Sequence, residues 1–261
     1  MVYINIERYG QGERVFVGYP GWGADHTRSF QLLLEHLPED TTFYAMNLPG
    51  LGGSEELDRP LSRWRWSAIT EALLRGFDSL KLDVPVTLVG SCSGSYHALE
   101  TAMRRPDMAH RVVMLEPFSY FPWFLRALVL PAIGPMLYNV AFANNTTRAL
   151  IFQVMRVAGV MGEFDPLSSW GSDDPWVPYT YLKLYQELSD QLGAPKRFHR
   201  VRCPTRIVVG EHTFGEILAS VGVWKSILGH VEVDRLTGVG HQITQDASAR
   251  TAHHTFKPDL V

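Results

Sequence analysis

The first part of the chain alternates between short apolar runs and segments in which apolar residues recur at helical intervals. The pattern predicts strands over 2–8, 14–17 and 42–46, and a helix over 27–37. Gly10 and Gly12 interrupt the chain between the first two strands, so we expect those strands to form a hairpin. This region therefore predicts the start of an alternating order of strands and helices.

The same alternation continues to the end of the chain. It predicts helices over 61–80 and from 95 to 103, and strands over 86–89, 111–115, 206–209 and 231–236. Strands that alternate with helices are typical of a mostly parallel sheet with helices on both faces. We therefore expect an α/β fold.

The length and the aromatic residues indicate one domain with an insertion. A chain of 261 residues suits a single large α/β domain. The segment 117–200 lies between two expected strands, is rich in tryptophan and tyrosine, and is expected to form a helical cap. The core would then consist of 1–116 and 201–261, and the loop 162–178 would be a mobile lid.

Composition and charge exclude several classes of protein. Hydrophobic residues make up 46% of the chain and charged residues 20%, which is ordinary for a globular protein. The net charge of -3, without a cluster of lysine or arginine, argues against a nucleic-acid partner. The first residues do not resemble a secretory signal, so we expect a cytoplasmic protein.

The most apolar segment, 123–142, is not expected to cross a membrane. It is interrupted by Arg126, Pro131, Gly134 and Pro135, which favours broken amphipathic helices. No membrane span is therefore predicted.

The sequence Gly90-Ser91-Cys92-Ser93-Gly94 lies directly between an expected buried strand and an expected helix. This spacing is typical of a sharp strand-to-helix turn that presents a nucleophile, and the two glycines select Cys92 as its middle residue. A helix N-terminus favours an anion, so the position suits a thiolate. The alternative is that Cys92 is a small buried residue that only packs in the core after a strand. The glycines on both sides of Cys92 argue against that role.

Three further segments carry a resemblance. The segment 15–23 (VFVGYPGWG) looks like a strand followed by an oxyanion loop, 47–54 (NLPGLGGS) is similar to a D-x-P-G-x-G-x-S loop, and Gly240-His241 follows the last expected strand. Together with the nucleophile turn, they make the chain resemble the α/β-hydrolase superfamily along nearly its whole length, the cap excepted. The resemblance implies an α/β-hydrolase fold with Cys92 as nucleophile, His241 as base, and the N–H groups of Trp22 and Ser93 as the oxyanion hole.

The chain departs from the family pattern at the acid. The family usually places an acid after the strand 206–209, where this chain has Thr213. Glu116 is the leading candidate because it closes the strand after the nucleophile helix, a position from which some family members take their acid. Glu211 is the second candidate. Two other interpretations remain. The thiolate–imidazolium pair could work without a carboxylate, and Glu116 could be a solvated residue at the rim of the sheet.

A cysteine at this turn suits acyl transfer. Family members with such a cysteine include dienelactone hydrolases and the chain-releasing Dieckmann-type cyclases, which make tetramate and pyridone rings in secondary metabolism such as antibiotic biosynthesis. The chain resembles the cyclases more, although their acid is typically Asp. The resemblance implies that an acyl group passes from a thioester to Cys92 and leaves by intramolecular cyclisation.

The expected substrate is a hydrophobic acyl thioester or ester. An acyl or peptidyl carrier protein is a candidate partner that would deliver it. Phe118, Tyr120 and Trp123 are expected to line its pocket, and neither a cofactor nor a metal is expected. Two alternatives remain: an ester, lactone or thioester hydrolase with the same triad, and a catalytically silent hydrolase fold that binds a ligand.

Overall fold

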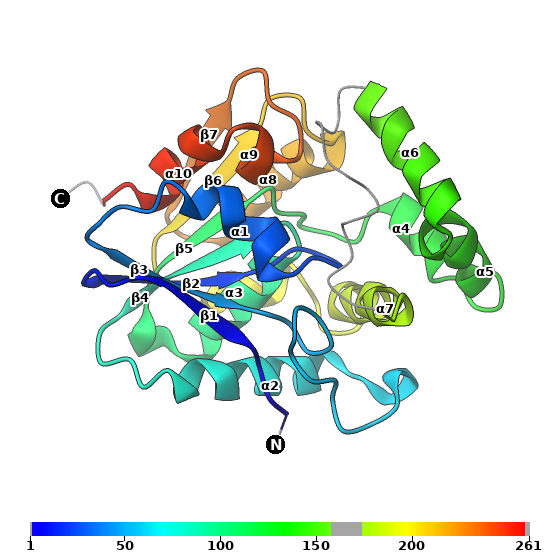
Figure 1. Ribbon diagram of the computed structural model, residues 1–261, viewed down its shortest axis with the longest axis horizontal. Helices are drawn as coiled ribbons and strands as arrows, with labels where there is room; N and C mark the ends of the chain where they lie inside the picture. Colours follow the sequence, from blue (N-terminus) through cyan, green and yellow to red (C-terminus); the bar gives the residue numbers. More distant parts are fainter. Residues whose placement is uncertain (1, 158–173, 259–261) are drawn as a thin grey trace.

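The structure, a computed structural model, describes residues 2–157 and 174–258 and is built on one seven-stranded sheet (Figure 1). Its order is β1-β3-β2-β4-β5-β6-β7, with β1 antiparallel to β3 and the other pairs parallel. The strands are β1 (Ile6–Gly10), β2 (Arg14–Tyr19), β3 (Thr41–Met46), β4 (Val86–Ser91), β5 (Ala109–Leu115), β6 (Thr205–Gly210) and β7 (Val231–Leu236). The predicted mostly parallel sheet is confirmed.

The predicted hairpin of the first two strands is wrong, because β3 lies between β1 and β2. Phe16 of β2 is in register with Phe43 of β3, while Ile6 of β1 is in register with Met46 on the other edge of β3. Strand β2 is buried over most of its length and takes a parallel partner on each side, whereas the polar, partly exposed β1 forms the edge of the sheet.

Helices cover both faces of the sheet. The helices of one face are α1 (His26–Leu34), α9 (Ile243–Asp246) and α10 (Ser248–Phe256). Those of the other face are α2 (Trp66–Ser79), α3 (Gly94–Arg104) and α8 (Gly215–Ile227). Successive residues of β5 divide between the two cores: Val112 and Met114 pack on the side of α3, and Val113 and Leu115 on the side of α1. Both layers follow from the alternation of side chains along a strand.

The helix expected over 61–80 is shorter than the prediction. Leu61–Arg63 forms a 3-10 turn, and α2 begins only at Trp66. Trp64 lies between them in extended conformation, is buried, and donates its indole N–H to the Arg59 carbonyl. Side chains two positions apart point to different sides of a helix, so one helix face could not bury both the Trp64 and the Trp66 indole. The helix therefore begins only after Trp64.

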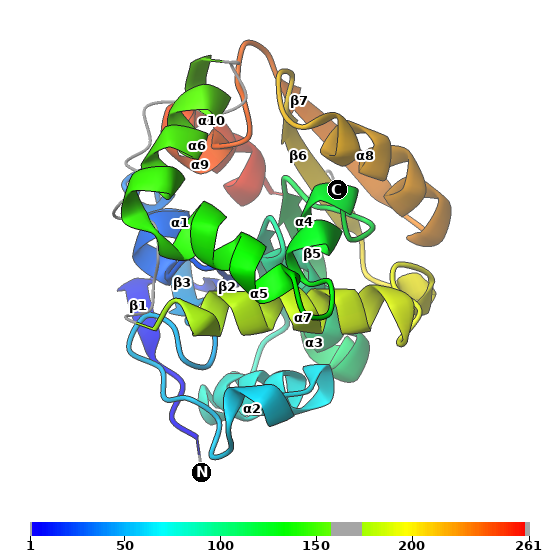
Figure 2. The ribbon, with the colours of Figure 1, turned by 90° about the vertical axis from the view of Figure 1, so that its right-hand side faces the viewer.

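The insertion between β5 and β6 is helical and lies beside the sheet (Figures 1 and 2). Its helices, which we call the cap helices, are α4 (Trp123–Leu128), α5 (Gly134–Tyr138), α6 (Asn145–Val157) and α7 (Trp176–Asp190). The segment 123–142 is divided into short helices, as expected from its prolines and glycine. Within 2–157 and 174–258, none of the helices combines the length and the apolar character that a membrane crossing requires.

The expected lid loop can be described only in part. Its residues 162–173 lie outside the described residues. At its other end, Trp176–Pro178 belong to the first turn of α7 and not to a loop, which corrects that boundary.

Candidate active site

The turn between β4 and α3 presents Cys92 in a conformation that side chains rarely adopt, with φ at +50°. Its two glycines are required by close backbone contacts. A Cβ atom on Gly94 would lie 2.2 Å from the Tyr19 carbonyl oxygen, and one on Gly90 would lie 2.3 Å from the Ser95 Cα. The turn therefore fits tightly between β2 and α3, and only glycine allows this approach.

Cys92 is also held by the neighbouring strand. Its N–H donates to the Leu115 carbonyl at the end of β5 at 2.7 Å. The thiol is free and partly exposed, and it lines a cavity of about 410 Å³. The other cysteine, Cys203, lies outside this cavity. The structure therefore positions one thiol at the end of the sheet where the parallel strands finish.

Glu116 lies directly after β5 and is almost fully buried, with 2% of its surface exposed. Its φ is +57°, and its own N–H donates to Val208 of β6. One carboxylate oxygen accepts from the Gly210 N–H, and the other accepts from the Thr213 hydroxyl and faces His241 Nδ1 at 3.0 Å. All three neighbours can donate, so the pocket around Glu116 suits a negative charge.

His241 lies in the loop after β7 and is brought to the end of β5 by this contact. Its ring packs against Phe214 and Phe118, with centroid distances of 5.0 and 6.3 Å. Burial lowers the pKa of His241, but hydrogen bonds to Cys92 and Glu116, together with the charges of both groups, outweigh burial and raise it to about 10. The raised pKa favours the imidazolium form of His241, between the Cys92 sulfur and the Glu116 carboxylate.

The two candidate acids occupy different environments. Glu116 meets His241, whereas the side chain of Glu211 is 49% exposed and accepts from the Gly238 N–H at 2.8 Å. Thr213, at the place of the usual family acid, is buried against Glu116. The contact between Thr213 and Glu116 was not predicted from the sequence, although the hydroxyl residue at the usual acid position was a signal for it.

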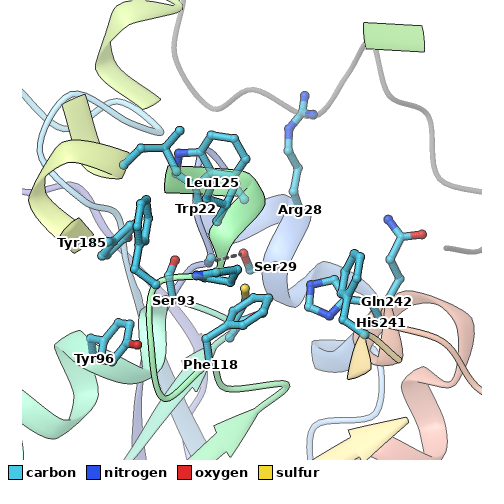
Figure 3. Close-up of a pocket in the computed structure, with 18 of the residues that line it drawn as sticks. Trp22, Arg28, Ser29, Ser93, Tyr96, Phe118, Leu125, Tyr185, His241 and Gln242 are labelled. Carbon is cyan, nitrogen blue, oxygen red and sulfur yellow. Dashed lines mark hydrogen bonds between the residues drawn. The ribbon is translucent and has the colours of Figure 1, made fainter. Parts of the chain in front are cut away.

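The expected oxyanion loop lies next to the thiol. Gly21 and Trp22 line the cavity, and a Cβ atom on Gly21 would lie 3.4 Å from the Cys92 Cβ. The Gly21 N–H donates to Ser29 of α1 (Figure 3). The Trp22 indole donates to Pro178 of α7 at 2.7 Å. Ser93 is the N-cap residue of α3, and its N–H is one that a helix leaves without an internal acceptor. The loop therefore links the turn to both α1 and the cap.

Asn47, which replaces an acidic residue of the family pattern, has a structural role. It is buried, accepts from the His26 N–H at 2.8 Å and donates to the Gly52 carbonyl at 2.8 Å. An amide can both accept and donate here, which a carboxylate cannot. This departure lies in the loop that supports α1.

The pocket is mostly apolar and is lined by both core and cap. Phe118 and Tyr120 line it as expected, and Leu125 and Phe121 add apolar side chains from the first cap segment. Trp123 does not line it: its side chain faces outward and is 74% exposed, which corrects the prediction for this residue. The apolar pattern of this segment could not separate the two sides of the short helix α4.

The comparison with family models matches residues 15–253 to the alpha/beta hydrolase family. A comparison with curated protein sequences finds no significant match. The match covers the turn at Cys92, the insertion between β5 and β6, and the His241 loop.

Solved structures share the fold at low sequence identity. A serine hydrolase involved in carbazole degradation aligns with a TM-score of 0.75 and 14% identity, over 97% of this chain and 93% of that one. The thioesterase domain from the curacin biosynthetic pathway aligns at 0.67 and 17%, over 98% and 96%. The enol-lactonase from Burkholderia xenovorans LB400 aligns at 0.69 and 15%, over 98% and 97%. The sheet order, the strand-to-helix turn at Cys92 and the family match lead to one conclusion: this chain belongs to the alpha/beta hydrolase family.

Proposed function

We propose that this protein is a cysteine-dependent acyl-transfer enzyme that takes an acyl group from a thioester onto Cys92. The observation that carries the proposal is the contact of His241 with Glu116 at 3.0 Å, on one side of the imidazole, while Cys92 interacts with the same ring. Nucleophile, base and acid then follow one another in the order of the family. Trp22 and Ser93 supply the N–H groups of the oxyanion hole.

The acylation step follows from these positions. The Cys92 thiolate attacks the thioester carbonyl, and the N–H groups of Trp22 and Ser93 stabilise the oxygen anion. The bond between the carbonyl carbon and the leaving sulfur then breaks. The His241 imidazolium gives its proton to the departing thiolate, and Glu116 keeps the ring oriented. An acyl thioester on Cys92 and a neutral His241 remain.

Release by cyclisation is the version that we propose. A thioester carbonyl accepts a carbon nucleophile well, and a pocket with apolar walls keeps hydrolytic water away. In a β-ketoacyl-aminoacyl substrate, His241 removes the proton between the two carbonyls. The resulting carbanion attacks the Cys92 thioester, a carbon–carbon bond forms, and the thiolate leaves. The expected partners are a hydrophobic acyl thioester and an acyl or peptidyl carrier protein.

Hydrolysis is the second candidate, favoured by structural neighbours described as hydrolases, a thioesterase and an enol-lactonase. It uses the same acyl-enzyme and differs only in the group that attacks it. A catalytically silent fold is disfavoured because Glu116, His241 and Cys92 are brought together in a pocket, an arrangement that binding alone does not need.

The test is to supply a β-ketoacyl-aminoacyl thioester of N-acetylcysteamine and to identify the products by mass spectrometry. Ring closure expels only the thiol, whereas hydrolysis adds water. We expect the ring as main product, a trapped acyl group on Cys92, no turnover for Cys92→Ala, and unchanged turnover for Cys203→Ala. Free acid that depends on Cys92 would replace cyclisation by hydrolysis, and the absence of an acyl-enzyme would contradict the whole proposal.

A further inference from the structure

Hydroxyl groups collect on one wall of the pocket. Ser93 comes from the nucleophile turn, Tyr96 from α3 and Tyr185 from α7. In Figure 3 these side chains lie on one side of the pocket, and His241 and Gln242 lie on the other. The hydroxyl wall is therefore separate from the acid–base pair.

Two of these hydroxyls are buried without a hydrogen bond of good geometry. Ser93 and Tyr185 are 6% and 5% exposed, and within the described residues neither oxygen has a well-aligned partner, although the two hydroxyls lie close enough to each other for Ser93 to lower the pKa of Tyr185. Other buried tyrosines do have one: Tyr19 pairs with Thr101, Tyr138 donates to Pro175, and Tyr181 donates to Pro49. A buried hydroxyl without a partner costs free energy, so this pair fits a place where a ligand oxygen completes the bonding.

The Tyr185 ring is held rigidly. It packs against Trp66, Tyr96 and His97 with centroid distances of 5.8, 6.1 and 6.2 Å. Burial lowers the pKa of His97 to about 3, so this neighbour adds no positive charge that would favour a tyrosinate. Tyr185 is thus a fixed, neutral donor.

The two hydroxyls lie near Cys92, since Ser93 directly follows it in the turn and Tyr185 lines the same pocket. Burial raises the pKa of Tyr185 most, a hydrogen bond with the Ser93 hydroxyl opposes that rise, and the charge of Cys92 adds to it. The pKa of Tyr96 is raised by burial and by Cys92 as well. An oxygen bound at the hydroxyl wall would therefore share the pocket with an acyl group on Cys92.

The geometry points to a site for a second carbonyl oxygen of the acyl substrate, bound by the hydroxyls of Ser93 and Tyr185. This inference rests on the proposed acylation of Cys92 and names the substrate class: acyl groups with a keto or amide carbonyl close to the thioester. Two donors suit a carbonyl oxygen, and they suit an enolate oxygen better. Much of the remaining wall, including Phe118, Phe121 and Leu125, offers only carbon atoms.

The site has a defined part in cyclisation. Neutral His241 takes the proton from the carbon next to the second carbonyl, and the electron pair moves onto that carbonyl oxygen, where Ser93 and Tyr185 donate to it. The carbon then attacks the thioester carbonyl, the bond to the Cys92 sulfur breaks, and the thiolate and the His241 imidazolium are restored. Every proton and electron pair is thereby accounted for within the site.

The test compares two probes that differ only in this carbonyl, the lauroyl and β-ketolauroyl thioesters of N-acetylcysteamine. Mass spectrometry of the protein measures the rate of Cys92 acylation for wild type, Tyr185→Phe, Ser93→Ala and Tyr179→Phe. Tyr179 is the matched control, since it is on the same helix α7 but packs against Tyr138 and Trp176. The quantity compared is kcat/KM for acylation by the β-ketolauroyl thioester divided by kcat/KM for the lauroyl thioester. We expect Tyr185→Phe to lower this ratio about ten-fold and Tyr179→Phe to leave it unchanged.

A binding measurement makes the test independent of turnover. The N-ethyl amides of lauric and β-ketolauric acid are titrated into the same proteins, with tryptophan fluorescence as readout. Tyr185→Phe should remove the preference for the keto amide, again about ten-fold. A ratio that stays at its wild-type value in both experiments, or equal losses for both probes, would overturn the carbonyl site. Failure of the proposed function would instead appear as wild-type protein that binds the keto amide and forms no acyl-enzyme.

Discussion

The hydroxyl of Thr213 donates to the same carboxylate oxygen of Glu116 that faces His241. The place where the family usually carries an acid is thus occupied by a donor that serves an acid from the neighbouring strand. A carboxylate therefore still contacts the imidazole. It belongs to the residue after β5, however, and not to a residue after β6.

Removing the charge of Glu116 should slow the reaction. We expect Glu116→Gln to lower turnover about ten-fold or more, because His241 loses the group that orients it and stabilises its positive charge. Glu211→Gln is the control, since Glu211 is bound to the Gly238 N–H on the surface and should be close to wild type. Steady-state rates of both variants check this, and the opposite ranking would move the acid to Glu211.

The acid should be transferable to position 213. In Glu116→Ala the space beside His241 is empty, and adding Thr213→Asp brings a carboxylate back to the usual family position. We expect the double variant to recover part of the turnover that Glu116→Ala loses. Thr213→Asp alone should lower the melting temperature, because two carboxylates in contact cannot both ionise without cost. No recovery in the double variant would argue against orientation as the role of Glu116.

The two cysteines should differ in reactivity. Burial raises the pKa of the Cys203 thiol, with only partial compensation from a backbone hydrogen bond, whereas Cys92 interacts with the His241 imidazolium. Iodoacetamide at neutral pH should therefore label Cys92 at least about ten-fold faster, with loss of activity. Peptide mapping by mass spectrometry measures both rates. Equal labelling of the two peptides would rule out an activated thiolate.

The protonation of His241 should make stability depend on pH. Its pKa rises from 6.5 to about 10 on folding, so the folded protein holds a proton that the unfolded chain loses near pH 6.5. The stabilisation is complete below pH 6.5 and declines as the pH rises towards 10. The free energy of unfolding, measured by urea titration at several pH values, should fall over this window more steeply for wild type than for His241→Gln. Parallel curves would contradict a proton held at His241.

The local patterns of the sequence predicted most of the elements well. The apolar runs of β4 and β6 and the spacing of apolar residues in α1 indicate the elements directly, because burial on one or two faces repeats along the chain. The pairing of β1 could not be obtained in this way. It depends on β3 entering between β1 and β2, so that Gly10 of β1 pairs with Thr42 and Ile6 pairs with Met46, far along the chain.

The candidate site could be predicted where a local motif exists. The glycines around Cys92 mark the turn because each one meets a backbone atom that excludes a Cβ. The wall formed by Ser93 and Tyr185 has no such motif, since α7 reaches the pocket only through the folded cap. The outward side chain of Trp123 was missed for a related reason: a six-residue helix gives too few positions to tell its inner side from its outer one.

The hydrogen bond from the Cys92 N–H to the Leu115 carbonyl fastens the turn at Cys92 to the strand that precedes Glu116. The proposed nucleophile and the proposed acid therefore belong to one unit, the paired strands β4 and β5, whose register runs up to Ser91 and Leu115. His241, the proposed base, comes from the loop after β7, two strands away, and that loop is bonded to the end of β6, where the Val239 carbonyl accepts from the His212 N–H at 2.8 Å. The proposed nucleophile, acid and base are therefore all fastened to the ends of β4 to β7, so the sheet itself sets the spacing between them.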